Sequence, residues 1–433
     1  MTSNIKFRKI LNDLKRRPED AAKDLKITKK KIIDILKNKS NLDFKIIQKA
    51  VEIWPINFGD FFSFKDDTNS DFKIMRSKLS DNSKRIMNRG GNPYYLYKDT
   101  VMSKLSPFKP ELITELTVVD SNNPKNPLVK FNNGHFLHQF TYFIGPVNFY
   151  YIKNNKKMVA KMNTGDSMYI SPYVPHSFTT RKNKQKILGK ILALTYTDRI
   201  DNETLNELSA LGFNVAKKNK LNLKNKKTSF WSNLENILRN SSLTFDQVKK
   251  YTSINLKKLK DKNQIPNQKY INIISSFLNV NIRDLLPPSN IVEVIIKKYS
   301  KNRRWFYPSN QNKSYLFNEL ANIPQLPYSR GYEVTILNNK KNNSILEVPS
   351  HQYIYNLGTT RIKFTISKKN DFLDPGDSLY IKPNKKHTFY KEGKLLILRL
   401  GGRICGESLY QLSMISEKNL KKVINDNKPW FNK

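Results

Sequence analysis

Five histidines are the residues of this chain best suited to chemistry, and all five lie in two sets of related segments. His135 and His138 lie in NNGHFLHQF, and His176 ends GDSMYISPYVPH. His351 begins HQYIYNLG, and His387 ends GDSLYIKPNKKH. Neutral imidazoles are the commonest metal ligands in proteins. A lone histidine on an apolar strand would be read as a core residue, but five in matching segments favour a metal site.

The first set of segments offers three ligands for one ion. If NNGHFLHQF is a buried strand, alternation places His135 and Gln139 on one face and His138 on the other. With His176 from the partner strand they form a three-ligand site with open positions, as non-haem Fe(II) enzymes use. The nearby acid, Asp166, is expected to cap a turn. We therefore expect the amide oxygen of Gln139 to replace the usual carboxylate, with His138 structural or in contact with a ligand.

The second set of segments has lost one ligand. Gln352 and His387 are retained, but Val348 stands where the first set has His135. We therefore expect the second site to be structural and the chain to bind one iron.

The amino-terminal parts of the two halves also match. Phe7, Leu11 and Leu25 recur as Phe230, Leu234 and Val248, and NFGDFF recurs as NIRDLL. Apolar spacings of three and four predict short amphipathic helices. Each copy resembles the helix-turn-helix domain of bacterial repressors, and we interpret both as packing or gating modules rather than DNA-binding domains.

The remainder of each half predicts an all-β unit, because short strands alternate with Gly, Pro and Asn. The GD…P…H segments resemble the second motif of the cupin family of jelly-roll barrels. The predicted fold is therefore a multidomain α+β protein, a tandem duplication of a helical module and a cupin barrel. The expected order is helical module 1 (1–65), linker and catalytic barrel 1 (66–228), helical module 2 (229–290), and linker, structural barrel 2 and tail (291–433).

Composition limits the classes of function. A chain of 433 residues with one cysteine, Cys405, and no secretory signal is expected to be a multidomain cytoplasmic protein without a disulfide. No apolar segment has the length to span a membrane. The net charge of +41 would suit nucleic acid, but the lysines are spread through every segment. We interpret them as a solvated surface, so a nucleic-acid partner is not expected.

Three local motifs extend the resemblance over nearly the whole chain. They are NNGH at 132–135, RGGNPYYLY at 89–97 and GDSMYISPYVPH at 165–176. Together they resemble the family of hydroxyethylphosphonate dioxygenase and methylphosphonate synthase, which are double cupins with inserted helix-turn-helix-like domains. In the dioxygenase branch a glutamate ligand precedes the second histidine by six residues, where this chain has Ile170. The synthase branch uses a glutamine four residues after the first histidine, which is the spacing of His135 and Gln139.

The resemblance also implies roles for individual residues. It assigns His135, Gln139 and His176 to Fe(II), with His176 also beside the substrate. Asn132, Arg89 and Tyr97 would bind the phosphonate, and Tyr97 would take part in catalysis.

A lysine from the first helical module is also implied at the active site, in binding and in catalysis. Lys15 is our choice, because Lys15, Arg16 and Arg17 correspond to Leu238, Arg239 and Asn240, so Lys15 is a cation that the second module lacks. Arg16 and Arg17 remain alternatives. All three residues could instead be cations that stabilise a helix C-terminus and have no role at the active site.

The implied reaction is Fe(II)- and O2-dependent cleavage of 2-hydroxyethylphosphonate to methylphosphonate and carbon dioxide or bicarbonate. Formation of hydroxymethylphosphonate and formate is the alternative within the family. A transcriptional regulator with a cupin sensor is the alternative of another class. Iron and manganese are not distinguished by the sequence, and a homo-oligomer would suit a module that closes over a neighbouring barrel.

Overall fold

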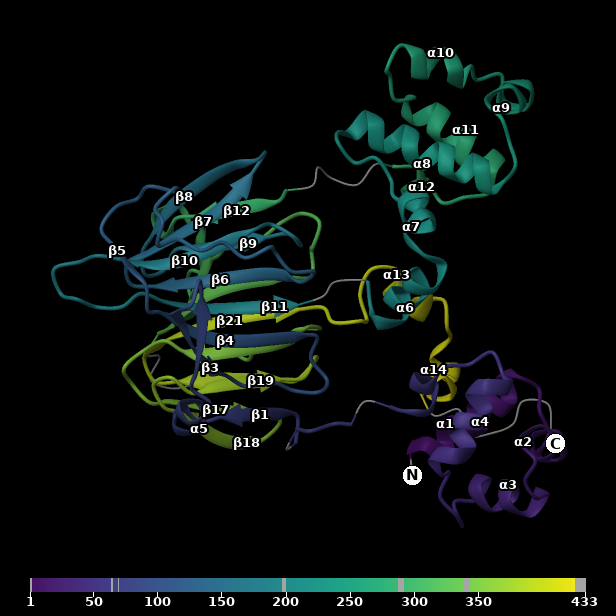
Figure 1. Ribbon diagram of the computed structural model, residues 1–433, viewed down its shortest axis with the longest axis horizontal. Helices are drawn as coiled ribbons and strands as arrows, with labels where there is room; N and C mark the ends of the chain where they lie inside the picture. The colour runs from purple at the N-terminus through teal and green to yellow at the C-terminus, as the bar shows by residue number, and fades with distance from the viewer. Residues whose placement is uncertain are drawn as a thin grey trace. The chain divides into compact units, whose positions relative to one another are not determined.

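The computed structural model describes residues 2–63, 65–68, 70–196, 200–286, 292–337 and 343–424. The chain forms two compact units. The first unit contains residues 1–68, 103–106 and 404–433, and the second contains residues 69–102 and 107–403. Helices and several β-sheets are both present, which agrees with the predicted mixed class (Figure 1). In the described ranges, every helix is too short or too polar to cross a bilayer.

The first unit is helical. Its elements are α1 (Thr2–Asp13), α2 (Pro18–Leu25), α3 (Lys29–Leu36), α4 (Phe44–Ile53), the 3-10 helix η1 (Phe58–Phe61), α13 (Glu407–Ser413) and α14 (Glu417–Ile424). The N-caps Thr28 and Asp43 accept hydrogen bonds from the first turns of α3 and α4. Phe7, Leu25 and Ile32 are fully buried in its core. The apolar spacing of three and four residues therefore did indicate amphipathic helices.

A second helical segment matches the first in its apolar pattern. Its helices are α6 (Asn202–Leu211), α7 (Phe213–Asn219), α8 (Lys226–Asn240), α9 (Phe245–Thr252), α10 (Leu256–Asp261), α11 (Gln268–Leu278) and α12 (Ile282–Leu285). Phe230, Leu234 and Val248, the partners of Phe7, Leu11 and Leu25 in the sequence comparison, are fully buried in its core.

The sheets of the first repeat position the candidate site. The strands are β2 (Arg85–Arg89), β3 (Asn92–Asp99), β4 (Phe108–Glu115), β5 (Val118–Val119), β6 (His138–Ile144), β7 (Val147–Lys153), β8 (Lys156–Met162), β9 (Ser167–Ile170), β10 (His176–Arg181) and β11 (Lys190–Tyr196). One sheet has the order β12-β9-β6-β11-β4-β3-β2 and the other the order β5-β10-β7-β8. A short helix, α5 (Ser77–Asn82), precedes β2.

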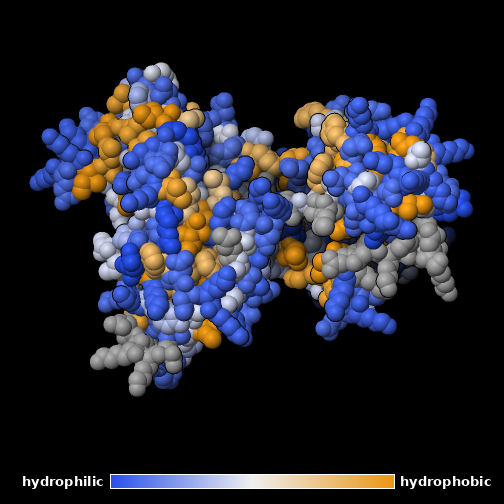
Figure 2. All heavy atoms as spheres, turned by 90° about the horizontal axis from the view of Figure 1, so that it is seen from below, coloured by the Kyte–Doolittle hydropathy of each residue, from blue (hydrophilic) through white to orange (hydrophobic). Residues whose placement is uncertain are grey.

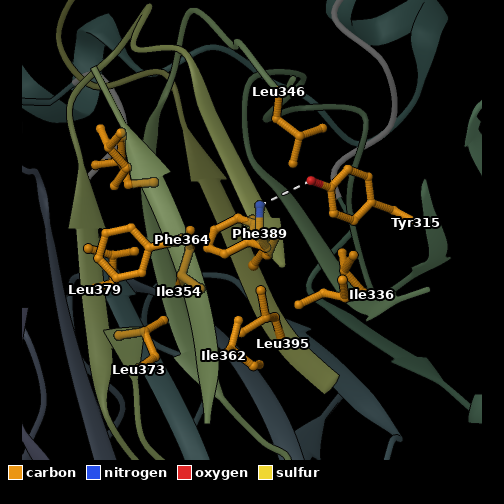
Figure 3. Packing of buried hydrophobic residues seen from close by; sticks show 14 of the residues in the cluster. Tyr315, Ile336, Leu346, Ile354, Ile362, Phe364, Leu373, Leu379, Phe389 and Leu395 are labelled. Atoms are coloured by element: carbon orange, nitrogen blue, oxygen red, sulfur yellow. Dashed lines mark hydrogen bonds between the residues drawn. The ribbon is translucent and has the colours of Figure 1, made fainter. Parts of the chain in front are cut away.

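The second repeat is built in the same way. Its strands are β13 (Arg304–Pro308), β14 (Lys313–Glu319), β15 (Arg330–Ile336), β16 (His351–Asn356), β17 (Ile362–Ile366), β18 (Lys369–Leu373), β19 (Ser378–Ile381), β20 (His387–Tyr390) and β21 (Gly393–Leu400), with the 3-10 helix η2 (Tyr299–Lys301) before β13. The sheet orders are β1-β19-β16-β21-β15-β14-β13 and β18-β17-β20. Figure 3 shows the apolar side chains between these sheets, with Phe364 and Phe389 among them.

Each repeat lends one strand to the other, which the sequence did not predict. The strand β1 (Phe72–Met75) pairs with β19, and β12 (Val294–Lys297) pairs with β9. The two Gly-Asp turns hold the ends of these strands. Asp377 accepts hydrogen bonds from Arg76 at 2.9 Å and from the backbone of Ser77 at 2.7 Å. Asp166 likewise accepts from Lys298 and from the backbone of Tyr299, each at 2.9 Å, and it also caps its own turn.

Backbone contacts fix which residues of the two repeats correspond. Tyr95 accepts a hydrogen bond from the backbone of Phe178 at 3.0 Å, and Tyr315 accepts one from Phe389 at 3.1 Å, drawn in Figure 3. The second repeat can therefore serve as an internal control that shows what the fold alone requires.

The surface is mostly hydrophilic. Polar and charged side chains cover much of the face shown in Figure 2, and hydrophobic residues interrupt them in separate groups.

Candidate metal centre

The loop that carries His135 differs from the prediction. We expected residues 132–140 to be one strand, but β6 begins only at His138. Gly134 has a φ of +76°, and a Cβ there would lie 2.6 Å from the backbone of Tyr173. The backbone N–H of Tyr173 donates to the carbonyl of His135 at 2.8 Å. The position of His135 is therefore set by a left-handed glycine turn and a contact with a distant loop, not by strand alternation.

The rings of His135 and His176 contact the backbone in the same way and lie close together. The Nδ1 of His135 lies 2.9 Å from the carbonyl oxygen of Leu137, and the Nδ1 of His176 lies 2.8 Å from that of Val174. A carbonyl only accepts, so each Nδ1 carries the proton and each Nε2 keeps a free lone pair. The ring centroids are 5.2 Å apart. Burial lowers the pKa of His176 to about 3, so its imidazole is neutral at physiological pH.

Gln139 completes the group. Its Oε1 lies 3.1 Å from the Nε2 of His135, and its Nε2 donates to the hydroxyl of Thr141 at 2.9 Å. Two ligand atoms at right angles, each about 2.1 Å from an octahedral ion, lie roughly 3 Å apart. The separation of the His135 nitrogen and the Gln139 oxygen fits such an ion.

The site contains no carboxylate ligand. Ile170 on β9 is the cross-strand partner of Gln139 and is fully buried, so an apolar side chain stands beside the amide. Among the described residues, no group of three or more His, Cys, Asp and Glu side chains could hold a metal. The donor set that can hold an ion here is two imidazoles and one amide, all neutral.

Asn132 lies at the edge of this group. Its Oδ1 accepts the backbone N–H groups of His176 at 2.8 Å and Gly134 at 3.1 Å. Because the oxygen is held by two donors, the Nδ2 points to the other side, 3.1 Å from the Nε2 of His176. Asn132 therefore presents N–H donors beside the predicted metal position.

Arg89 and the tyrosines after it lie on the neighbouring sheet edge. The guanidinium of Arg89 donates to the carbonyl of Lys130 at 2.9 Å and reaches that of His176 at 3.5 Å. It also lies 4.7 Å from the ring centroid of Tyr95. Tyr97 packs edge-on against Tyr95 at 6.0 Å, and burial raises its pKa to about 12. The Arg89 guanidinium therefore lies close to the carbonyl oxygen of His176, and Tyr97 lies on the far side of Tyr95 along β3.

The candidate cations of the first helical segment lie in another unit. Lys15 occupies the turn after α1 with a φ of +54°. Arg16 and Arg17 are engaged locally with Asp24 and Asp20, each at 2.9 Å. Arg16 and Arg17 are therefore paired within the first helical segment.

His138 has a counterpart in the second repeat. It bonds to the hydroxyl of Tyr169, and His351 bonds to that of Tyr380 at 2.7 Å. Burial lowers the pKa of both histidines to about 4. Since the second repeat keeps this pair without the first ligand, the pair belongs to the fold, which favours the structural role for His138.

Sequence reasoning missed Glu115 at the end of β4. Its side chain is fully buried, and within the described residues neither carboxylate oxygen has a hydrogen-bond partner. Burial raises the pKa of this carboxyl well above its ordinary value, while Arg89 opposes the shift. Glu115 pairs across the sheet with Tyr95, and Ile336 pairs in the same way with Tyr315, the counterpart of Tyr95 in the second repeat. Ile336 is therefore the counterpart of Glu115, so the fold accepts an isoleucine at this position. Only the comparison of the two repeats could have drawn attention to this acid.

The second repeat has a cation beside Gln352, the counterpart of Gln139. The backbone of Asn384 donates to the carbonyl of Val348 at 2.8 Å, as Tyr173 does to His135, so Val348 stands at the position that corresponds to His135. The Nε of Arg399 donates to the Oε1 of Gln352 at 3.3 Å. The register partner of Gln352 is Arg399, whereas that of Gln139 is Thr195.

The chain is similar to enzymes of phosphonate metabolism over nearly its full length. A methylphosphonate synthase of Nitrosopumilus maritimus (strain SCM1) is 43% identical over 435 residues, 98% of this chain and 94% of that protein. Streptomyces albus HEPD, solved with 2-hydroxyethylphosphonate and Fe(II) bound, is 30% identical with a TM-score of 0.93, covering 99% of this chain and 98% of that one. No protein-family model matches.

A further solved structure supports the fold. A hydroxyethylphosphonate dioxygenase matches with a TM-score of 0.74 at 16% identity, over 98% of this chain and 99% of that chain. Fold and site together place the protein in the class of Fe(II)-dependent phosphonate enzymes. The chain belongs to the family of methylphosphonate synthase and hydroxyethylphosphonate dioxygenase.

Proposed function

We propose that this protein is a methylphosphonate synthase that holds one Fe(II) through His135, Gln139 and His176. The observation that carries this proposal is the 3.1 Å approach of the Gln139 amide oxygen to the His135 Nε2, with Ile170 beside it. A carboxylate at the position of Ile170 would instead favour the dioxygenase reaction. The 43% identity to a methylphosphonate synthase supports the same branch.

The proposed reaction cleaves the carbon-carbon bond of 2-hydroxyethylphosphonate. One substrate and one dioxygen give one methylphosphonate, one carbon dioxide and one water. The substrate supplies all four electrons, so neither 2-oxoglutarate nor a nicotinamide is required. Fe(II), when bound, supplies the redox centre at which substrate and dioxygen meet.

The protein's own part is to bind and orient the phosphonate. The planar guanidinium of Arg89 matches two phosphonate oxygens, and Asn132 adds a fixed N–H donor. Tyr97 keeps its proton at physiological pH, because its pKa is about 12, and it is proposed as a neutral donor. Lys15 is proposed as a further cation for binding and catalysis. Such donors hold the C2 hydrogen in one place during the reaction.

The test is phosphorus NMR of the products after Fe(II)-loaded protein, purified without oxygen, receives 2-hydroxyethylphosphonate and air. We expect methylphosphonate from the wild type and loss of both tight iron binding and turnover in Gln139→Ala. Hydroxymethylphosphonate would transfer the chain to the dioxygenase branch. Unchanged substrate with iron bound would reject the proposed reaction, and full activity of Gln139→Ala would reject the ligand set.

The finer architecture is part of this proposal. We assign residues 1–65 and 229–290 to helix-turn-helix-like modules, and residues 66–228 and 291–433 to two cupin barrels with their linkers and the tail. The match to HEPD over nearly the full chain supports this division. The homo-oligomer and the cytoplasmic location stay predictions from the sequence.

A further inference from the structure

Thr141 is a buried residue whose hydroxyl contacts a proposed ligand. It lies on β6 two residues after Gln139, so both side chains share one face of the strand. It is fully buried, and its Oγ1 accepts the Gln139 amide N–H at 2.9 Å.

The two ends of an amide are chemically different, and only the oxygen can bind a metal. A carboxylate that rotates by 180° still presents an oxygen to the metal. A glutamine amide that rotates by 180° presents its NH2 group instead, which cannot bind the metal. A glutamine ligand therefore needs a fixed acceptor for its nitrogen. Thr141 supplies one at the side away from His135.

The second repeat shows what happens without that acceptor. Gln352 is followed at the same spacing by Ile354, which is fully buried and has no hydroxyl. Here the Oε1 of Gln352 accepts from Arg399, and its Nε2 is turned toward the Nε2 of His387 at 3.3 Å. The amide oxygen thus faces His135 in the first repeat, whereas in the second repeat the amide nitrogen faces His387, the counterpart of His176.

We propose that Thr141 is the positioning residue that makes Gln139 a metal ligand, by accepting the amide N–H and directing the oxygen to the ion. This inference rests on the proposed metal centre. Groups that orient metal ligands in this way commonly change metal affinity by about 10- to 100-fold when they are removed.

A packing role for Thr141 predicts a different result from a positioning role. Thr141→Val keeps the shape and removes the acceptor, whereas Thr141→Ser keeps the acceptor and removes a methyl group. Positioning therefore predicts that the valine variant loses metal affinity although its shape is kept. It also predicts that the serine variant keeps metal affinity although its midpoint falls.

The experiment measures Co(II) and anaerobic Fe(II) affinity of the full-length protein by competition with a chelator, beside the thermal midpoint of each metal-free variant. We expect Thr141→Val to bind about 10- to 100-fold more weakly. Thr141→Ser should bind close to the wild type. The matched control is Thr179→Val, since Thr179 is also fully buried but its hydroxyl has no partner among the described residues.

A double-mutant cycle separates this inference from the proposed function. In a Gln139→Ala background, Thr141→Val should cause no further loss, because no amide is left to orient. Equal metal affinity of Thr141→Val and the wild type, with Gln139→Ala weakened, would overturn the role of Thr141 and leave the metal centre in place. A wild type whose metal affinity is unaffected by Gln139→Ala would instead overturn the proposed centre itself.

Discussion

At the scale of the residue, the unusual feature of the proposed metal site is that its three ligands are all neutral. The Nδ1 contacts to backbone carbonyls orient both imidazole rings, burial keeps the imidazole of His176 neutral, and the amide carries no charge. An ion bound here keeps its full positive charge. With Arg89 close to His176, the pocket then favours a doubly charged anion such as a phosphonate.

This charge balance predicts opposite effects of Gln139→Glu on metal and substrate. The added carboxylate should strengthen Fe(II) binding and weaken the phosphonate, because a negative charge about 5 Å away opposes it by a few kcal/mol at an effective dielectric of about 20. We expect KM for 2-hydroxyethylphosphonate to rise by about tenfold or more. Chelator competition and initial rates would measure both quantities, and an unchanged KM with tighter metal would contradict this account.

The residue types of the site were predictable from the sequence, but their placement was not. The repeat and the clustering of all five histidines singled out His135, Gln139 and His176. The turn at Gly134 was not predicted, because it depends on contact with Tyr173 in a separate loop. The burial of Glu115 was not predicted either, because the sequence alone does not distinguish a buried acid at the end of a strand from an exposed one.

At the scale of the element, the two repeats share one fold but differ at the positions of the proposed metal ligands. The helical pattern and the strand pattern could both be read from local periodicity. The exchange of β1 and β12 could not, because the strand pairs of an exchanged sheet are set by contacts between repeats rather than by local residues. Asp166 and Asp377, each in a Gly-Asp turn, are now seen to secure those strands.

The second repeat should become a metal site when its three differences from the first are reversed. Val348→His restores the proposed first ligand, Arg399→Thr removes the cation, and Ile354→Thr supplies the acceptor that Thr141 provides in the first repeat. We expect the triple variant to bind a second Co(II) per chain, measured by elemental analysis after gel filtration. A variant with Val348→His and Ile354→Thr that keeps Arg399 should not, because a cation opposes the charge of a metal ion. A second Co(II) bound by that variant would refute the role given to Arg399.

At the scale of the whole molecule, buried titratable groups connect the sites to folding stability. Burial lowers the pKa of His387 from 6.5 to about 4, so the folded protein resists a proton that the unfolded chain accepts. Stability is therefore lost as the pH falls from about 6.5 toward 4, by about 3 kcal/mol for this histidine. Glu115 acts in the opposite direction, because its pKa is raised above 4.5 in the folded state.

The pH dependence of the metal-free protein should show these two effects separately. The thermal midpoint of the wild type should fall on acidification below pH 6.5. Glu115→Gln has no proton to lose, so its midpoint relative to the wild type should rise as the pH increases above 4.5. Below that pH the carboxyl is protonated in both the folded and the unfolded wild type, and the difference should become constant. Scanning calorimetry from pH 4 to 9 would measure it, and a difference that does not change with pH would mean that Glu115 is ionised with an ordinary pKa in the folded protein.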